Sequence, residues 1–198
     1  MSAFVYGLGI GFSLILAIGA QNAFVLKQGL KQQYVFWVCF ICALSDSILI
    51  YFGVTGFSKV IANFPLLLTV SKYFGAAFLF LYGLRNFYSA IKNSSSLNPS
   101  DLEKDSLLKI IGICLAFTWL NPHVYLDAII LIGSISVQFS DQLYQFAAGT
   151  ILASWIFFFS VGYGAKMLLP LFKRATSWKI LDVLIGITMW TIATMLII

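Results

Sequence analysis

Apolar residues fill this chain in six long runs that are separated by short polar joins. The runs cover residues 3–26, 34–56, 66–91, 107–135, 143–168 and 178–198. Because a helix needs about 20 apolar residues to cross a bilayer, the pattern predicts six membrane-spanning helices. The expected fold class is therefore an all-α integral membrane protein, with residues 1–198 forming a single transmembrane domain.

Composition supports this prediction and narrows the function. Of the 198 residues, 61% are hydrophobic and 10% are charged, whereas about a quarter of the residues in a soluble domain are charged. No segment remains for a soluble catalytic or nucleic-acid-binding domain, so the net charge of +5 indicates topology and not binding to nucleic acid. The first basic residue is Lys27, so the basic leader of a secretory signal is missing and the first run is expected to remain as a span.

The distribution of Lys and Arg predicts the orientation in the membrane. Ten of the twelve flank the first, third and fifth joins, and only Lys59 and Lys72 lie on the opposite side. Basic residues are enriched in cytoplasmic loops, so both termini are expected outside. The ten are Lys27, Lys31, Arg85, Lys92, Lys104, Lys109, Lys166, Lys173, Arg174 and Lys179.

A polar linker over residues 92–106 divides the chain into repeat one, residues 1–91, and repeat two, residues 107–198. Each half has three predicted spans, and an odd number makes the halves run through the membrane in opposite senses. This layout is typical of inverted repeats in transporters. When Asn22 is aligned with Asn121, three further positions match: Leu16 with Leu115, Ala17 with Ala116, and Val25 with Val124.

Spans one and four are interrupted at corresponding places. Span one contains Gly19-Ala20-Gln21-Asn22, and span four contains Asn121-Pro122. Proline lacks an amide hydrogen and clashes with the preceding turn, whereas asparagine followed by proline suits the start of a helix. We expect a second half-helix to begin at Pro122, with a simple proline kink as the alternative.

Two acidic residues lie inside otherwise apolar runs. Asp46 is the only charge in residues 34–56, and Asp127 lies in residues 107–135. An ionised side chain near the bilayer centre costs about 2.5–3.5 kcal/mol on insertion scales and is usually kept for a partner, a cavity or a substrate. The pair predicts a cationic cargo, a proton, or both; a structural role, such as bonding Ser or backbone groups, remains the alternative for each acid.

These residues could together hold a free amino acid with a cationic side chain. The amides at the helix start, from Pro122 to Val124, would bind its α-carboxylate, and Asp46 and Asp127 would bind its cation. His123 shares a helix face with Asp127. The remaining candidates are Gln21, Asn22 and Asn121 as neutral hydrogen-bonding groups and Tyr125, with Trp119, as an aromatic wall.

The membrane potential constrains how such a cargo leaves the cell. Moving one positive charge outward against an inside-negative potential costs about 2.3 kcal/mol per 100 mV. Exchange for one incoming proton removes this cost. An acid that binds either the proton or the cargo would couple the two movements, and Asp46 and Asp127 are the candidates.

Other polar residues and glycines are expected to be structural. Cys39, Cys42 and Cys114 read as small apolar packing residues, and three cysteines with one histidine do not have the spacing of a zinc site, so no metal or cofactor is predicted. Asp182 is expected to cap a helix or lie at the surface. The glycines are expected to permit close helix packing, and the pair at 7 and 11 is also compatible with a homodimer; they are Gly7, Gly9, Gly11, Gly162 and Gly164.

The chain resembles the LysE-type basic amino acid exporters over essentially its full length, and three stretches carry the resemblance. They are residues 11–29, Asp46 with Gly53-Val54, and Thr118-Trp119-Leu120-Asn121-Pro122-His123-Val124-Tyr125-Leu126-Asp127 with the following Leu131-Ile132-Gly133-Ser134. The resemblance implies a bacterial inner-membrane exporter of L-lysine and L-arginine, with no catalytic residues. It also implies that Asp46, Asp127 and the Asn-Pro pair matter for transport.

Two other functions stay open at this stage. Sister exporters of neutral amino acids share the fold and the Asn-Pro element, although the Gln-Asn of span one and the continuation from His123 to Asp127 favour the basic branch. A membrane thiol–disulfide electron carrier is the alternative from another class, but it needs cysteines on both broken spans, and span one has none. A membrane hydrolase is less favoured because His123 has no evident partnered nucleophile.

Overall fold

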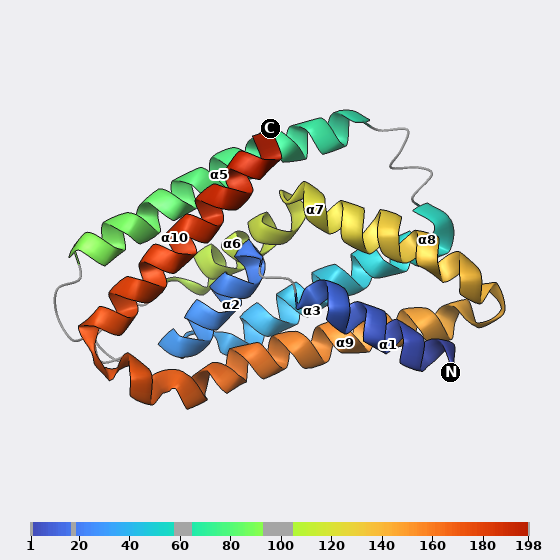
Figure 1. Ribbon diagram of the computed structural model, residues 1–198, viewed down its shortest axis with the longest axis horizontal. Coiled ribbons are helices and arrows are strands. Elements are labelled where there is room, and N and C mark those ends of the chain that lie inside the picture. The colour runs from blue at the N-terminus through green and yellow to red at the C-terminus, as the bar shows by residue number, and fades with distance from the viewer. Residues whose placement is uncertain (1, 17–18, 58–64, 93–104, 198) are drawn as a thin grey trace.

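The computed structural model describes residues 2–16, 19–57, 65–92 and 105–197, and its regular structure in these ranges is entirely helical (Figure 1). Within these ranges, three helical stretches are long and apolar enough to cross a membrane: Val35–Gly56, Pro122–Phe172 and Thr176–Ile197. The bent pair Ala3–Ile15 and Ala20–Lys31 makes a fourth if it counts as one span. The chain is therefore a helical membrane protein that crosses the bilayer several times.

The first predicted span consists of two helices. α1 (Ala3–Ile15) and α2 (Ala20–Lys31) meet at 84°, so the predicted interruption of this span is confirmed. Gly19 is the N-cap of α2, and Asn22 donates from Nδ2 to the carbonyl of Ile15 at 2.8 Å. The last carbonyl groups of a helix have no backbone amide to bond within that helix. The Asn22 side chain supplies a donor to one of them, the carbonyl of Ile15 at the end of α1.

The next two predicted spans are α3 (Val35–Phe52), which continues as the π-helical η1 (Gly53–Phe57), and α5 (Pro65–Lys92). Most of the predicted polar linker lies outside the described residues. Where the chain is described again, Asp105 accepts from Lys109 Nζ at 2.5 Å and lies 3.5 Å from Arg85 Nη2. Partial burial raises the pKa of Asp105, but the hydrogen bond from Lys109 and the charge of Arg85 outweigh it and lower the pKa overall.

The second half begins with a broken span and ends with two long helices. α6 (Leu107–Trp119) stops just before the Asn-Pro pair, and the chain resumes as α7 (Pro122–Tyr125), η2 (Leu126–Leu131) and α8 (Ile132–Ser136). A 3₁₀-helical segment, η3 (Val137–Gln142), is interrupted at the non-helical residue Phe139 and leads into α9 (Leu143–Gly164). η4 (Ala165–Lys173) then connects α9 to α10 (Ala175–Ile197).

The helices pack in pairs around a short central group. α5 and α10 lie side by side along one flank, α1 lies along α9 on the other, and α2, α3 and α6 lie between these pairs (Figure 1). Large apolar side chains also lie on the outer surface of the α5–α10 pair, where Phe74 and Leu81 are 65% and 64% exposed. An apolar outer surface of this kind is expected where a helix faces lipid.

Glycines let α1 and α9 approach closely. A Cβ atom on Gly7 would collide with the carbonyl of Phe146, and one on Gly11 would lie 2.7 Å from the Cβ of Ala153. Gly162 is similarly covered, by the Cys39 sulfur, but Gly9 and Gly164 face open space. The predicted packing role is therefore confirmed for three of the five glycines and wrong for Gly9 and Gly164.

Alanine at Gly7 should destabilise the protein, whereas alanine at Gly9 should not. The added methyl of Gly7→Ala must push α1 away from α9, and overpacking of this kind costs about 1–3 kcal/mol. Gly9→Ala is the matched control because it changes the same helix two residues away with no nearby atom. Thermal unfolding of the purified protein in detergent measures both, and equal midpoints would contradict the proposed tight α1–α9 contact.

Candidate functional site

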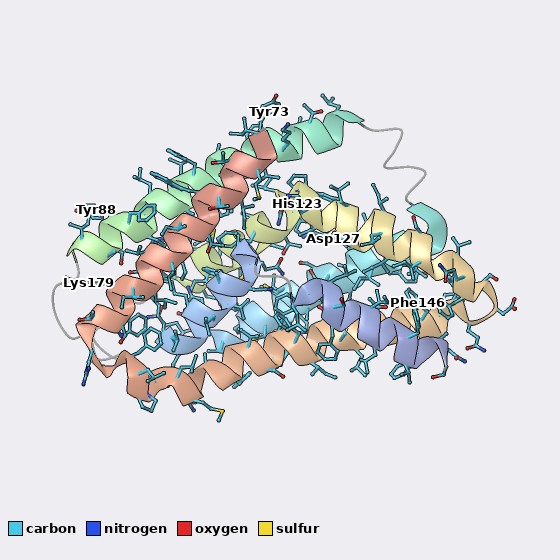
Figure 2. All side chains as sticks on the ribbon, in the orientation of Figure 1. Tyr73, Tyr88, His123, Asp127, Phe146 and Lys179 are labelled. Carbon is cyan, nitrogen blue, oxygen red and sulfur yellow. The ribbon has the colours of Figure 1, made fainter. Side chains whose placement is uncertain are left out.

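A cavity of about 260 Å³ lies where the two broken spans meet. Six of the eight predicted site residues line it: Gln21, Asn22, Asp46, Asn121, His123 and Asp127. Apolar walls complete it, from Leu14, Ile15, Ile50, Val124, Ala128, Ile132, Phe158 and Ile192. Figure 2 shows His123 and Asp127 near the middle of the molecule, between Lys179 at one end and Phe146 at the other. A mainly apolar cavity with a few converging polar groups is typical of a small-molecule site.

The second half-helix of span four begins at Pro122, as predicted. Asn121 is its N-cap, and its Oδ1 accepts from the His123 amide at 3.2 Å. The Asn121 carbonyl also accepts from the Val124 amide at 3.1 Å. Pro122 has no amide hydrogen and the next two amides are already bonded at the helix start, and their binding to a carboxylate stays a prediction.

Asp46 projects from α3 toward α9. The hydroxyl of Ser154 donates to its Oδ2 at 3.2 Å, and Ser154 is itself fully buried. None of the ion pairs within the described part of the chain involves Asp46. One neutral hydrogen bond leaves acceptor sites on this carboxylate, which has about four. Sequence reasoning did not identify Ser154, whose only signal is a hydroxyl within an apolar helix.

Asp127 lies on η2 one helical turn after His123, and both side chains are exposed at the edge of the cavity. The cavity therefore reaches the surface of the molecule beside these two residues. Across residues 2–16, 19–57, 65–92 and 105–197, Asp127 takes part in no ion pair. Two carboxylates thus line one cavity, and neither forms an ion pair with a described basic residue, although His123 acts electrostatically on Asp127 from one turn away.

Gln21 supplies the other unusual polar group. Its side chain is only 7% exposed, and its Nε2 lies near Asp46 without a hydrogen bond of normal geometry to any described residue. A buried donor without an acceptor costs about 1–3 kcal/mol. Gln21 also lines the cavity, so its side chain forms part of the wall beside Asp46.

Two of the predicted site residues do not line the cavity. Pro122 begins the half-helix, and Tyr125 is buried behind it. The Tyr125 hydroxyl donates to the Trp119 carbonyl at 2.6 Å, which ties the new helix to the end of α6 across the break. The aromatic wall predicted at Tyr125 is therefore not part of the cavity lining in this structure, where its hydroxyl holds the break together.

The prediction that Asp182 caps a helix or lies at the surface is also wrong. Asp182 is 4% exposed, and its Oδ1 lies 2.5 Å from the Nζ of Lys27, which is 8% exposed. The Lys27–Asp182 pair joins α2 to α10 and lies outside the cavity lining.

All three cysteines are buried, and none of them forms a disulfide.

Known proteins resemble this chain over nearly its full length. The model of the family described as "LysE type translocator" matches residues 12–198. Proteins named "Arginine exporter protein ArgO" from Salmonella schwarzengrund (strain CVM19633), Salmonella enteritidis PT4 (strain P125109) and Salmonella typhi are each 39% identical over 194 residues, which are 98% of this chain and 92% of each relative. No solved structure gives a significant match.

Removing the cap at the helix break should weaken the structure around the cavity. Asn121→Ala leaves the His123 amide without its acceptor, and the loss of an N-cap typically costs about 1 kcal/mol. Asn121→Ser keeps an oxygen that can cap and is the matched control. Thermal unfolding in detergent should rank wild type and Asn121→Ser together above Asn121→Ala; a fully stable alanine variant would show that the cap is dispensable.

Proposed function

The chain belongs to the LysE type translocator family, and we propose that it exports the basic L-amino acids arginine and lysine in exchange for protons. The family is one of transporters, so the protein is not an enzyme. The observation that carries the proposal is the pair of carboxylates, Asp46 and Asp127, that line one cavity without a basic partner among the described residues. The arginine-exporter relatives support the same cargo class.

The polar groups of the cavity match the charges of a basic amino acid. Such a cargo has two cationic groups, the α-ammonium and the side chain, and the cavity offers two carboxylates. Its α-carboxylate needs a donor, and Gln21 Nε2 is one that lacks a hydrogen bond of normal geometry. Asn22 and Asn121 line the same space, although each already holds a helix end through one side-chain atom.

This charge balance distinguishes the proposal from export of neutral amino acids. A neutral amino acid has one cationic group, so one of the two carboxylates would stay without a counter-charge in a partly apolar cavity. A binding site can reject the wrong ligand because that ligand leaves a charge of the site without a counter-charge. The cavity therefore favours a cargo with a net positive charge.

The arrangement of helices supports six spans built as two inverted repeats, residues 1–91 and 107–198 joined by the linker 92–106. The paired breaks fall in the first span of each half, between α1 and α2 and between α6 and α7. The second spans, α3 and α9, contact each other, as do the third spans, α5 and α10. Inverted repeats with broken helices at the centre are a common transporter architecture.

The proposed location is the inner membrane of a bacterium, with both termini outside. The repeats would expose the cavity to each side in turn. Cargo loaded from the cytoplasm would pair with Asp46 and Asp127, and a proton arriving from outside would neutralise one of these acids and release the cargo. That acid would return to the cytoplasm with its proton, so each cycle would exchange one monovalent cation for one proton.

Asp46→Asn should reduce export of arginine and lysine while leaving the fold intact. Asparagine keeps the size of the side chain and can still bond Ser154, but it loses the charge that attracts the cargo. A charge-assisted hydrogen bond is worth about 1.5–3 kcal/mol, which corresponds to roughly a tenfold to hundredfold weaker interaction. Cells fed arginine-, lysine- or leucine-containing dipeptides, with labelled efflux measured, give the test.

Asp141→Asn is the matched control, because Asp141 is exposed in η3 and does not line the cavity. It should export at the wild-type rate when membrane abundance is equal. Undiminished arginine and lysine efflux from the Asp46→Asn variant would remove the basis of the cargo assignment. Efflux of leucine that depends on Asp46 would instead favour the neutral amino acid exporter.

Exchange of one proton for one monovalent cation should move no net charge. In proteoliposomes with a fixed pH gradient, the rate of arginine transport should therefore change little when a potassium diffusion potential is varied. Collapsing the pH gradient at constant potential should slow transport. Clear movement of net charge in each turnover would contradict the proposed stoichiometry without affecting the identity of the cargo.

A further inference from the structure

A second buried carboxylate lies outside the cavity and is surrounded by polar groups. Asp182 on α10 accepts from Lys27 Nζ through Oδ1 at 2.5 Å and from the Ser89 hydroxyl through Oδ2 at 2.7 Å. Lys27 Nζ also donates to Oδ1 of Asn86 at 2.5 Å, and Asn86 Nδ2 is held by the Tyr82 carbonyl at 2.8 Å. The four side chains Lys27, Asn86, Ser89 and Asp182, which we call the inner cluster, join α2 to α5 and α10.

The inner cluster lies between the cavity and the basic end of the molecule. Lys27 follows Gln21 by six residues on α2, which places it about 9 Å further along the helix axis. α2 runs from the middle of the molecule toward the end where α10 begins (Figure 1), and Figure 2 shows Lys179 and Tyr88 at that end. On the orientation proposed above, this end is cytoplasmic, so the inner cluster closes the side from which cargo is loaded.

Aromatic rings fill the space beside the inner cluster. The ring of Phe24 on α2 lies 5.3 Å from that of Phe117 on α6 and 6.0 Å from that of Tyr82 on α5, and Phe78 lies 5.0 Å from Phe117. Phe24 and Phe117 are each 1% exposed. Phe24 is one turn from Gln21 and one turn from Lys27, so this layer closes the route along α2 between them. Aromatic faces attract cations and would not bar a basic side chain once the helices separate.

The chemistry of the inner cluster matches that of the proposed cargo. Lys27 presents to Asp182 the same ammonium group that the side chain of a lysine cargo carries. A buried ion pair is weak evidence for a role in stability, because removing two charges from water offsets much of their attraction. This pair is instead suited to exchange, since a cation from the cytoplasm could replace Lys27 without leaving Asp182 uncompensated.

We propose that Asp182, together with Asn86 and Ser89, is a second binding site for the cation of a basic amino acid, and that Lys27 occupies it while the cytoplasmic side is closed. When α2 moves away from α5 and α10, Lys27 leaves and the cargo takes its place. The cargo then passes the aromatic layer to reach Asp46 and Asp127. The inference rests on the proposed export of basic amino acids.

Binding of labelled arginine to the purified protein tests the proposal. Lys27→Met removes the internal competitor and leaves Asp182 available, so arginine should bind at least about fivefold more tightly than to wild type, the lower end of typical coupling between sites. Labelled leucine should show no such gain. The double variant Lys27→Met/Asp182→Asn should lose the gain in arginine binding.

A background without Asp46 separates this inference from the proposed function. In Asp46→Asn the cavity site is weakened, and Asp46→Asn/Lys27→Met should regain arginine binding through Asp182. The triple variant Asp46→Asn/Lys27→Met/Asp182→Asn should not regain it. Export of arginine by wild type with no gain in either Lys27→Met protein would overturn this inference alone, and so would a gain that survives the loss of Asp182.

Lys27→Arg keeps the proposal testable if methionine at this position prevents folding. Arginine keeps the positive charge, and its planar guanidinium can bind a carboxylate through two hydrogen bonds, so it should compete more strongly for Asp182. The KM for cytoplasmic arginine should then rise severalfold with an unchanged maximal rate of export. A lower maximal rate with an unchanged KM would indicate a structural role for the pair and contradict a binding site.

Discussion

Carboxylates placed within membrane-spanning helical stretches are the constraint on which this protein depends. A charge in the membrane interior is expensive, and the chain meets this cost in two different ways. Asp182 is neutralised by the chain's own Lys27, whereas Asp46 and Asp127 line a cavity without a basic partner in the described ranges. The first acid is satisfied in the closed structure, and the other two have their charges balanced only when a cation or a proton occupies the cavity.

The helix breaks place these acids where a ligand can reach them. An unbroken helix would satisfy its backbone internally and leave no room at the centre. Here the 84° bend between α1 and α2 and the interruption before Pro122 open the space, and side chains take over the missing hydrogen bonds. Asn22 serves the end of α1, Asn121 serves the start of α7, and Tyr125 ties that start to the end of α6. The asparagines therefore hold the breaks and line the cavity at the same time.

The sequence allowed the parts of the site that depend on local chemistry to be predicted. Asparagine followed by proline identifies the start of a helix wherever it occurs, and a lone aspartate in an apolar run is visible without a fold. Both predictions needed only a few neighbouring residues. The likeness between the two halves around Asn22 and Asn121 also directed attention to the two segments that meet at the cavity.

Features that depend on distant contacts could not be predicted in this way. Lys27 and Asp182 are 155 residues apart, so local sequence predicts a loop charge for Lys27 and a helix cap or surface charge for Asp182. The partner of Asp46, Ser154, lies 108 residues away in a helix with no other distinguishing signal. The amides after Pro122 were expected to remain available, but the asparagine that marks the helix start also bonds the first of them. In each case the deciding contact comes from a tertiary arrangement or from a side chain with two roles.

α2 gives a physical route by which the two cation sites could work as one device. Its first turn carries Gln21 and Asn22 in the cavity, its middle carries Phe24 in the aromatic layer, and Lys27 follows one turn later at Asp182. A rigid movement of this helix changes all three levels together, so the inner cluster cannot open while the cavity wall stays unchanged. A ligand shifts a conformational equilibrium only by its difference in affinity for the two states. A basic amino acid has such a difference under the proposed mechanism, because Asp182 is available to it only after Lys27 has left, whereas a neutral side chain gains nothing from that exchange. Selectivity for charge would thus arise from the opening of the inner cluster as well as from the cavity that lies beyond it.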